Sequence, residues 1–484
     1  MDAHEYVTHD ARGLAALVAN GDVSPGEVLE AAIAAIDARN PELNAVVARC
    51  DDAARADVAA GLPDGPLRGV PYLIKDLNAH VAGLPSTQGV RLFADAVAER
   101  DSEFVARLRR AGMVILGKTN TPGFGSSTST EPGLFGQCHN PWNLDHVAGG
   151  SSGGAASAVA GGMVPAAHAT DGGGSIRIPA SCCGLFGLKV TRGRITHAPY
   201  AGEGWNGMSV GHAVTRSVRD SAVLLDATCA PFPGDPYAAP APARPYLDEV
   251  TIEPGRLRIG MLDRQPVTGL EPDAECRAGF EATARLLESL GHHVDPAEWP
   301  VLDLPPASIT GTISSTHIAN AVDRRLEALG RDLREDDLDA WIHFIVERGR
   351  GITGEEYVQA VAAMHAAGRA VAALMADYDV LFTPTMAIVP PKLGILDPNG
   401  AFVDALPYLG AMSGFLSIAN ITGQPAMSVP LHRSADGLPV GVHFVAPFGD
   451  EATLFRLAGQ LERAAPWPHL PQPPEASLTV AGRR

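Results

Sequence analysis

Residues 149–184 read GGSSGGAASAVAGGMVPAAHATDGGGSIRIPASCCG, and this stretch, rich in glycine and alanine, decides the fold of the chain. The small residues of 155–160 predict a helix that packs closely against a sheet. The apolar run 164–169 predicts a buried strand that leads into a row of glycines. A helix of small residues followed by a buried strand and a glycine turn is typical of an α/β core.

Helical and strand-like patterns alternate on both sides of that stretch. Apolar runs that predict strands occur at 70–74, 114–117, 257–262, 380–385 and in the strand-and-turn pattern of 426–446. Helical patterns occur near 14–18, at 24–39, 102–112, 273–291, across most of 310–378 and at 450–464. This alternation predicts an α/β fold with a mixed or mainly parallel sheet.

The helical pattern after residue 24 has a marked start and end. Ser24 is followed by Pro25 at the first helical position and by Glu27 three residues after Ser24, which together make a capping box. The Asn40-Pro41 pair is expected to stop this helix, because proline cannot donate the backbone hydrogen bond that continues it.

Composition excludes several classes of protein. The chain has 484 residues, of which 46% are hydrophobic and 19% are charged, so it can bury a large core. Its net charge of −18 disfavours binding to nucleic-acid phosphates or to an anionic membrane surface. We therefore expect a small-molecule substrate as the partner, with no nucleic acid and no membrane.

Cysteine content and the N-terminus predict a cytoplasmic protein. Six cysteines without CxxC spacing indicate neither a disulfide framework nor a zinc site, and no metal or organic cofactor is implied. The N-terminus has acidic residues where a signal peptide needs basic ones, and no run of apolar residues is long enough to predict a membrane span. The oligomeric state stays open, with a homodimer among the alternatives.

Two glycine-flanked serines carry part of the candidate chemistry. Glycines around Ser151 let the backbone approach other groups closely, although a Gly/Ser tract is also typical of a linker. Ser175 follows a row of three glycines with unhindered N–H groups, Gly172, Gly173 and Gly174. Such a row can form an oxyanion hole beside a nucleophilic serine, and a tight turn is the alternative.

Lys75 lies at the end of the strand-like run 70–74, in an apolar setting. Burial disfavours the charged form of lysine, so its pKa falls and it can act as a base. A surface lysine beside Asp76 is the alternative for this position taken alone. Lys75 precedes Ser151, and Ser151 precedes Ser175 by 24 residues, an order and spacing that together favour a catalytic set.

The joint pattern resembles the amidase signature family of serine hydrolases. The matching segments span nearly the whole chain and read GVPYLIKD, LGKTNTPGFG, NPWN, AGGSSGGAASAVAGG, TDGGGSIRIPASCCGLFGLKVTRGRI and ITGQPAMSVP. The resemblance implies a large mixed, mostly parallel sheet with helices on both faces. It implies hydrolysis of a carbon–nitrogen amide bond through an acyl-enzyme on Ser175, with Ser151, in a cis peptide, bridging the nucleophile to Lys75. It further assigns the oxyanion hole to Gly172, Gly173, Gly174 and the N–H of Ser175.

The same resemblance implies a single domain over residues 1–484 with four regions. These are the N-terminal helices (1–65), a catalytic core with the signature motifs (66–215), a more variable substrate-pocket region (246–425), and the closing strands and helix (426–470). Asp171 and Arg177 match the motif and are expected to buttress the nucleophile loop.

Several residues depart from the family pattern. Gly172 stands where the family usually has Thr, Ile or a similar residue, which loosens the loop or makes room beside the acyl site. Glu131-Pro132 and the run 335–341 are similar to the 6-aminohexanoate cyclic-dimer hydrolases, a group within the family that also includes aryl amidases and urethanase-like members.

Substrate-pocket residues are expected by position in the family. Ser126 and Ser127 lie on a loop where the family contacts substrate, and Ser314 falls where the nylon-oligomer group places a pocket residue. An apolar wall is a further expectation, with ordinary core packing as the alternative, for Tyr200, Trp205 and Met208.

The substrate class stays open, because amides, oligoamides, carbamates and esters all give an acyl-enzyme at Ser175. A glutaminase-type subunit of a tRNA-dependent amidotransferase is an alternative on the same fold, disfavoured by Pro132 and by the divergent region 310–420. A non-catalytic binding protein is disfavoured by the intact Lys75 and Ser151.

Overall fold

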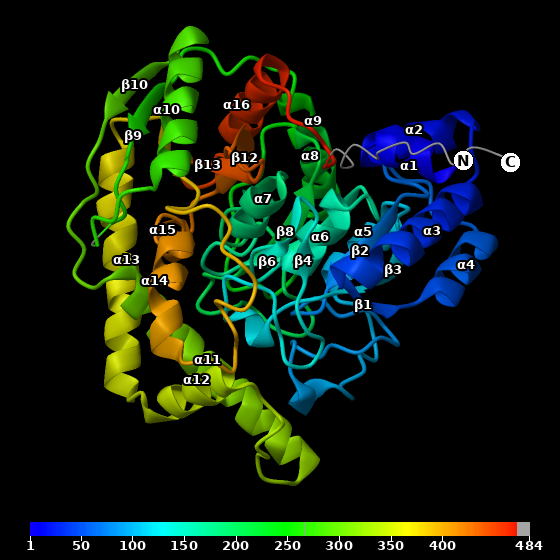
Figure 1. Cartoon of the computed structure of the whole chain (residues 1–484), viewed down its shortest axis with the longest axis horizontal. Helices are drawn as coiled ribbons and strands as arrows, with labels where there is room; N and C mark the ends of the chain where they lie inside the picture. Colours follow the sequence, from blue (N-terminus) through cyan, green and yellow to red (C-terminus); the bar gives the residue numbers. More distant parts are fainter. Residues whose placement is uncertain (267, 472–484) are drawn as a thin grey trace, which may run out of the picture.

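The structure is a computed structural model that describes residues 1–266 and 268–471, and an eleven-stranded sheet runs through it (Figure 1). The strand order is β1-β3-β2-β6-β8-β7-β12-β13-β11-β9-β10. In chain order these strands are β1 (Val46–Arg49), β2 (Pro71–Lys75), β3 (Val114–Thr119), β6 (Ala166–Asp171), β7 (Phe186–Lys189), β8 (Val210–Thr215), β9 (Arg258–Met261), β10 (His293–Pro296), β11 (Val380–Pro384), β12 (Ala426–Arg433) and β13 (Pro439–Val445). A separate pair consists of β4 (His139–Asn140) and β5 (Asn143–Val147).

The large mixed sheet that the sequence predicts is confirmed. Parallel pairs form two blocks, β3-β2-β6 and β11-β9-β10. The prediction of mainly parallel pairing holds within these blocks, whereas the strands between them pair antiparallel. The reason is local: β8 returns between β6 and β7, and a short turn joins β12 to β13, which forces the two strands to run in opposite directions.

Helices cover the sheet. The helices near the central and C-terminal strands are α5 (Glu103–Arg110), α6 (Gly153–Ala160), α7 (Arg177–Cys183), α8 (Val218–Thr228), α9 (Tyr246–Glu249), α10 (Ala274–Ser289) and α16 (Glu451–Ala464). α6 packs against α7 and α8 packs against α16, and both pairs contact the central strands. Two further short 3-10 segments are Arg91–Phe93 and Gly123–Gly125.

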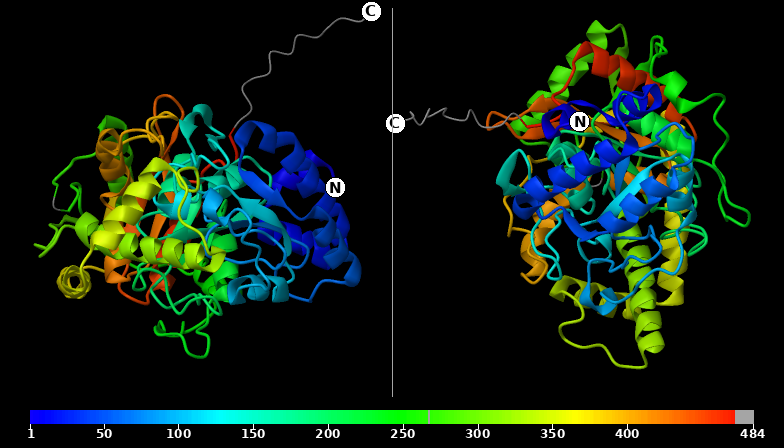
Figure 2. Two further views of the ribbon diagram at one scale, coloured as in Figure 1. Left: turned by 90° about the horizontal axis from the view of Figure 1, so that it is seen from below. Right: turned by 90° about the vertical axis from the view of Figure 1, so that its right-hand side faces the viewer.

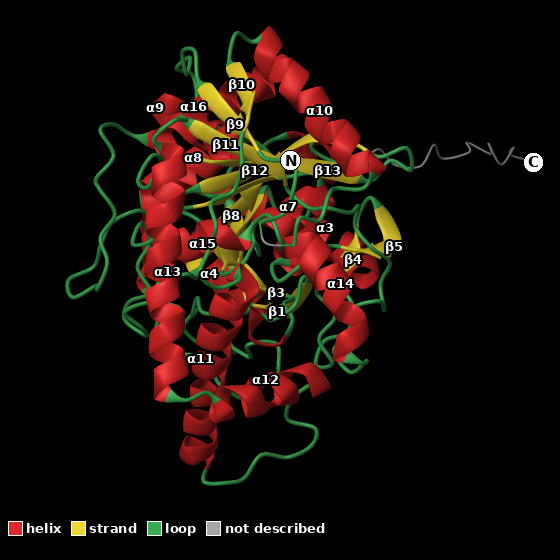
Figure 3. Ribbon diagram, turned by 90° about the vertical axis from the view of Figure 1, so that its left-hand side faces the viewer, coloured by secondary structure: helices red, strands yellow, loops and turns green. Residues whose placement is uncertain are grey.

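Two helical groups lie at opposite ends of the molecule (Figures 1 and 2). The N-terminal group contains α1 (Ala3–Thr8), α2 (Ala11–Asn20), α3 (Pro25–Leu43) and α4 (Asp51–Ala60). The other contains α11 (Pro306–Leu329), α12 (Ala340–Gly351) and α13 (Gly354–Met375), with α15 (Ser417–Thr422) packed on α11 and α13. Helix α14 (Phe402–Ser413) lies to one side of α11 and α13 (Figure 3). The largest apolar core contains residues of the N-terminal helices and of the sheet, whereas the buried apolar residues of α11 and α13 form separate, smaller clusters.

The helix after Ser24 begins as the sequence predicts and ends later. Ser24 and Glu27 form both hydrogen bonds of the capping box. The expected stop at Asn40-Pro41 is wrong, because α3 continues through Pro41 to Leu43. Proline is tolerated there since it lies in the last turn, and the Asn40 side chain then accepts the N–H groups of the two residues after Asn44.

Helix α13 is long and apolar enough to cross a membrane by length and composition alone. One such helix is weak evidence of a membrane span, and α13 packs along α11 and α15 in this fold. Its exposed face mixes polar residues such as Gln359 and Arg369 with Val358 and several alanines. Its inner face carries buried apolar residues such as Met364 and Val371, which indicates a helix that packs on a protein core.

A buried ion pair fastens the closing helix to the core. Glu451, at the start of α16, is 0% exposed and accepts hydrogen bonds from Arg194 at 2.7 and 3.0 Å and from the Thr191 N–H at 2.8 Å. The pair fixes the chain between β7 and β8, which leads into the loop 203–209.

We predict that Glu451→Ala lowers the free energy of unfolding by about 3–5 kcal/mol, because it leaves the Arg194 charge buried without its partner. Urea unfolding followed by circular dichroism measures this change. Glu30→Ala, which removes the exposed partner of Arg55, is the matched control and should cost far less. Equal losses in the two variants would contradict the prediction.

Candidate functional site

Lys75 is the last residue of β2 and is fully buried. Its Nζ lies 2.7 Å from Ser151 Oγ, 2.9 Å from Ser152 Oγ and 2.9 Å from Thr170 Oγ1. Because β2 pairs in parallel with β6, the carboxyl ends of both strands bring Lys75 and Thr170 to the same edge of the sheet. The amine is therefore surrounded by three hydroxyl groups.

Burial lowers the pKa of Lys75 well below its ordinary value, and the negative charge of Asp171 opposes this shift only in part. A neutral amine has one lone pair and can accept a proton from a neighbouring hydroxyl. The Ser152 hydroxyl donates to the Thr170 carbonyl oxygen at 3.2 Å, so its proton is already engaged. Ser151 and Thr170 are then the hydroxyls able to donate to the neutral amine.

Ser151 is held just before the start of α6 by close backbone packing. The Gly150–Ser151 peptide bond is cis, as the family resemblance implies. A side chain at Gly150 would lie 2.6 Å from the backbone of Ser127 and Ser129, so only glycine fits there. The Ser151 carbonyl oxygen also accepts a hydrogen bond from Thr121 Oγ1 at 2.9 Å.

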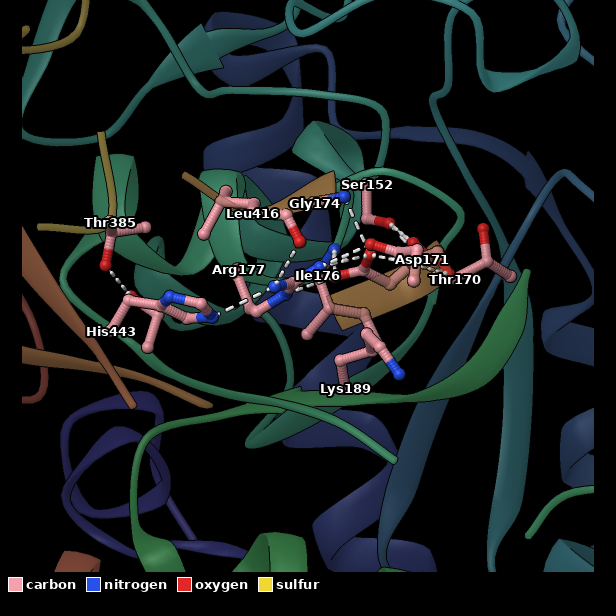
Figure 4. A network of polar contacts seen from close by, with 12 residues as sticks. Ser152, Thr170, Asp171, Gly174, Ile176, Arg177, Lys189, Thr385, Leu416 and His443 are labelled. Carbon is pink, nitrogen blue, oxygen red and sulfur yellow. Dashed lines mark hydrogen bonds and ion pairs between the residues drawn. The ribbon is translucent and has the colours of Figure 1, made fainter. Parts of the chain in front are cut away.

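The loop before Ser175 is shaped by one buried carboxylate. Asp171, at the end of β6, accepts hydrogen bonds from the N–H of Gly174 at 2.7 Å and from the N–H of Ile176 at 3.1 Å. Arg177 donates to both of its oxygens at 2.9 Å (Figure 4). The Arg177 guanidinium holds the pKa of Asp171 below its ordinary value in spite of burial. This geometry supports the expected buttressing role of both residues.

Arg177 also reaches the C-terminal half of the chain (Figure 4). It donates to the Leu416 carbonyl oxygen at 3.0 Å, to Asn420 Oδ1 at 2.7 Å and to His443 Nε2 at 3.0 Å. Burial and the nearby Arg177 charge lower the pKa of His443 well below its ordinary value, so its imidazole is neutral and Nε2 accepts. Asn420 donates back to Asp171 at 2.9 Å, which closes the network.

One N–H group of the expected oxyanion hole already has a hydrogen-bond acceptor. The Gly174 N–H donates to Asp171, so it is engaged before any substrate binds. Within the described residues, the Asp171 carboxylate accepts no hydrogen bond from the N–H groups of Gly172, Gly173 or Ser175. A Cβ added at Gly173 would meet no atom within 4 Å, so this part of the loop borders open space.

Ser175 lies half-buried on this loop, immediately before α7. Within the described residues its hydroxyl makes no hydrogen bond, so the structure brings Lys75 to Ser151 but does not link Ser151 to Ser175. Catalytic hydrogen bonds are often long in unliganded enzymes and tighten when substrate binds.

The three serines predicted for the substrate pocket differ in their contacts and in where they lie relative to Ser151. Ser126 Oγ is buried without a hydrogen-bond partner, and a side chain at the preceding Gly125 would lie 2.9 Å from Ser151 Oγ. Ser127 Oγ accepts the Ser129 N–H at 3.2 Å, which shapes the same loop. Ser314 is half-buried on α11, beside the buried Ile313.

The three residues expected to form an apolar wall lie in different environments. Trp205 packs on the nucleophile loop, because a Cβ at Gly172 would lie 2.6 Å from its ring. Met208 is fully buried in an apolar cluster with Ile309 and Ile313. Tyr200 is 41% exposed and donates to the Arg100 carbonyl oxygen, so it faces away from this cluster.

Sequence reasoning missed four polar residues of the site: Thr170, Asn420, His443, and Thr383, whose Oγ1 lies 2.9 Å from His443 Nδ1. Thr170 was within reach, because it precedes Asp171 at the end of the same predicted strand. The other three lie more than 200 residues from the nucleophile loop, and nothing local marks them. Within the described residues, no cluster of three or more His, Cys, Asp or Glu side chains could hold a metal ion.

Comparisons with known proteins agree with this geometry. The sequence matches the family described as Amidase over residues 27–455. It is 40% identical over 470 residues to the 6-aminohexanoate-cyclic-dimer hydrolase of Paenarthrobacter ureafaciens, covering 95% of each chain. A solved structure of 6-aminohexanoate cyclic dimer hydrolase complexed with substrate matches with a TM-score of 0.90 and 39% identity over 95% of this chain and 98% of that chain. A bacterial aryl acylamidase of the amidase signature family matches with a TM-score of 0.85 and 28% identity over 95% and 96% of the two chains.

The chain therefore belongs to the amidase signature family. It is a hydrolase that acts on amide carbon–nitrogen bonds other than peptide bonds, and its substrate is a small molecule. The likeness to solved members of the family also accounts for the large mixed sheet with its covering helices.

We predict that Arg177→Leu lowers the free energy of unfolding by about 3–5 kcal/mol, because it leaves the Asp171 charge buried without its cation. Chemical unfolding at neutral pH measures the loss. Arg177→Lys keeps the charge but not the forked contacts, so it should recover only part of the stability. A Leu variant as stable as the wild type would show that the pair does not hold the loop.

Proposed function

We propose that Ser175 is the nucleophile of this amidase, that Ser151 relays its proton, and that neutral Lys75 is the base. The observation that carries the proposal is the 2.7 Å contact between Lys75 Nζ and Ser151 Oγ in a fully buried setting. The depressed pKa of Lys75 supports a neutral amine able to accept the proton. Ser175 lies on the loop that Asp171 and Arg177 hold in place.

In the acylation step, Ser175 passes its proton to Ser151, and Ser151 passes its own proton to Lys75. The Ser175 oxygen forms a bond to the substrate carbonyl carbon, and the oxygen that becomes negative is stabilised by N–H groups of Gly172, Gly173 and Ser175. Lys75 then returns a proton through Ser151 to the leaving nitrogen, and the carbon–nitrogen bond breaks. Water repeats the same transfers and releases the acid.

This sequence of steps requires one movement. The Ser175 hydroxyl must reach a position from which it donates to Ser151. A substrate carbonyl group bound at the loop would favour the side-chain rotamer that makes this contact.

For the substrate we propose a small amide of the oligoamide type, of which the cyclic dimer of 6-aminohexanoate is the leading case. The relatives at 40% identity, which are named for that activity, support this choice. Aryl amides are the next class, supported by the aryl acylamidase neighbour, and carbamates and esters follow because they give the same acyl-enzyme. We further propose a cytoplasmic enzyme, with a homodimer as its assembly.

We predict that Ser175→Ala lowers kcat/KM by about a thousandfold or more, because the acyl-enzyme cannot form. The assay follows amine release from 6-aminohexanoate cyclic dimer, a linear oligomer, a nitroanilide, an aryl carbamate and glutamine. Ser157→Ala is the matched control, since this buried serine on α6 donates to the His139 carbonyl oxygen and contacts neither Lys75 nor Ser151. Unchanged turnover in Ser175→Ala would refute the nucleophile, and turnover of glutamine alone would favour an amidotransferase subunit.

We predict that kcat/KM falls as the pH is lowered through the pKa of Lys75, because the protonated amine cannot accept the relay proton. Burial depresses that pKa, so activity should persist well below the pH at which free lysine becomes protonated. A pH–rate profile measures the midpoint, and circular dichroism at each pH verifies that the fold is intact. A midpoint at the ordinary value of lysine would contradict a buried neutral base.

A further inference from the structure

Trp205 lies against the nucleophile loop at a position where only glycine fits. A Cβ at Gly172 would lie 2.6 Å from Trp205 Cζ3 and 2.9 Å from Cε3, too close for any side chain. Gly172 is not among the glycines with a left-handed φ, so its backbone would accept alanine. The glycine is therefore needed to make room for the indole ring and not for backbone freedom.

The backbone turn that carries Trp205 is fixed from several sides. Trp205 and Asn206 both have positive φ, at 53° and 55°, which non-glycine residues rarely adopt. Tyr357, on α13, donates to Asn206 Oδ1 at 3.1 Å, and His317 Nε2, on α11, lies 3.0 Å from the Tyr357 hydroxyl. The turn is closed by the Met208 N–H, which donates to the Trp205 carbonyl oxygen at 3.1 Å.

This chain of contacts ties α11 and α13 to the catalytic loop. Since the Tyr357 hydroxyl donates to Asn206, it must accept a hydrogen bond from His317. Burial lowers the pKa of His317, so its neutral ring carries the proton on Nε2. The position of Trp205 is thus set by helices that lie at the far end of the sheet (Figure 1).

The indole ring also fills the gap between the nucleophile loop and α11. Trp205 packs on the apolar cluster that contains Met208 and Ile313, and on the cluster that contains Phe124 and Ile318. Gly173, the next residue in the loop, borders open space, and Ser175 follows two residues later. The half-buried indole ring therefore lies against the loop segment that leads to Ser175, where an acyl group must enter.

We propose that Trp205 is the specificity-determining wall for the acyl half of the substrate, and that Gly172 and Trp205 form a matched pair in which the glycine admits the ring. The indole face selects an acyl group that is an unbranched methylene chain or a flat ring, because such groups lie along it without steric conflict. Asn206 and Tyr357 are positioning residues for this wall. The proposal rests on the proposed nucleophile Ser175 only for the place of the acyl group.

A double-mutant cycle tests the pair. Wild type, Gly172→Ala, Trp205→Ala and the double variant are assayed on the amide that the wild type hydrolyses, and on homologues with the acyl chain two methylenes shorter and longer. Gly172→Ala alone should lower kcat/KM about tenfold or more, since displacement of a pocket wall misplaces the substrate. In the Trp205→Ala background the same change should cost less than about threefold, because the steric conflict is gone.

The neighbouring glycine provides the matched control. Gly173 is also a glycine of the same loop, and a Cβ added there would not contact Trp205. The effect of Gly173→Ala should therefore be the same with Trp205 or Ala at position 205. An equal cost of Gly172→Ala in both backgrounds would overturn the pairing. Trp205→Phe repeats the measurement if the alanine variant is unstable, because it keeps an aromatic ring but reduces the steric conflict.

Tyr357→Phe tests the positioning chain. Loss of the hydroxyl frees Asn206, so the preference for acyl-chain length should shift toward that of Trp205→Ala, with a larger change in KM than in kcat. A purely structural role would lower the melting temperature and leave the length preference unchanged, and that result would overturn the positioning role. Failure of Ser175→Ala to abolish turnover would refute the nucleophile separately, because the cycle measures only the coupling between positions 172 and 205.

Discussion

The buried pair of Asp171 and Arg177 is the interaction on which the rest of the site depends. Both side chains are 0% exposed, so neither charge can be left without its partner. Asp171 collects the N–H groups of Gly174 and Ile176 as well as Arg177, and this converts a flexible glycine run into a fixed loop. Arg177 also donates to Asn420 Oδ1 and to His443 on β13 (Figure 4), so the network joins the loop before Ser175 to the C-terminal part of the chain.

Two buried lysines on neighbouring strands have different partners: Lys118 lies beside a carboxylate, and Lys75 lies among hydroxyl groups. Lys118 on β3 lies 3.7 Å from the Asp76 carboxylate and has its pKa lowered by burial to about 8. Lys75 on β2 contacts three hydroxyls and no carboxylate, and burial lowers its pKa well below the ordinary value. A carboxylate stabilises the charged amine, whereas hydroxyls can exchange protons with a neutral one, so of these two lysines Lys75 has the surroundings that the proposed proton relay needs.

Two contacts determine the shape of the loop that carries Ser175: hydrogen bonds to the Asp171 carboxylate, and the close packing of the Trp205 ring on Gly172. Asp171 accepts a hydrogen bond from the Gly174 N–H, so the oxyanion hole that we propose uses the other N–H groups of the glycine row. Gly172 gives room to Trp205, whose position is set through Asn206 by α11 and α13. Residues of the region 310–378 thus support the turn that carries Trp205, through Tyr357 on α13 and His317 on α11.

The sequence by itself determined the elements whose signals are local. The capping box at Ser24, the strand that ends at Lys75 and the glycine-flanked serines are all set by neighbours within a few residues. Tertiary structure alone decided the rest, because the deciding contacts join distant segments. Helix α3 continues past Pro41, and β8 lies between β6 and β7 in the sheet. Asn420 and His443 contact Arg177, and Trp205 packs on Gly172. A close approach of two buried groups depends on how whole helices and strands pack, and no local pattern records that distance.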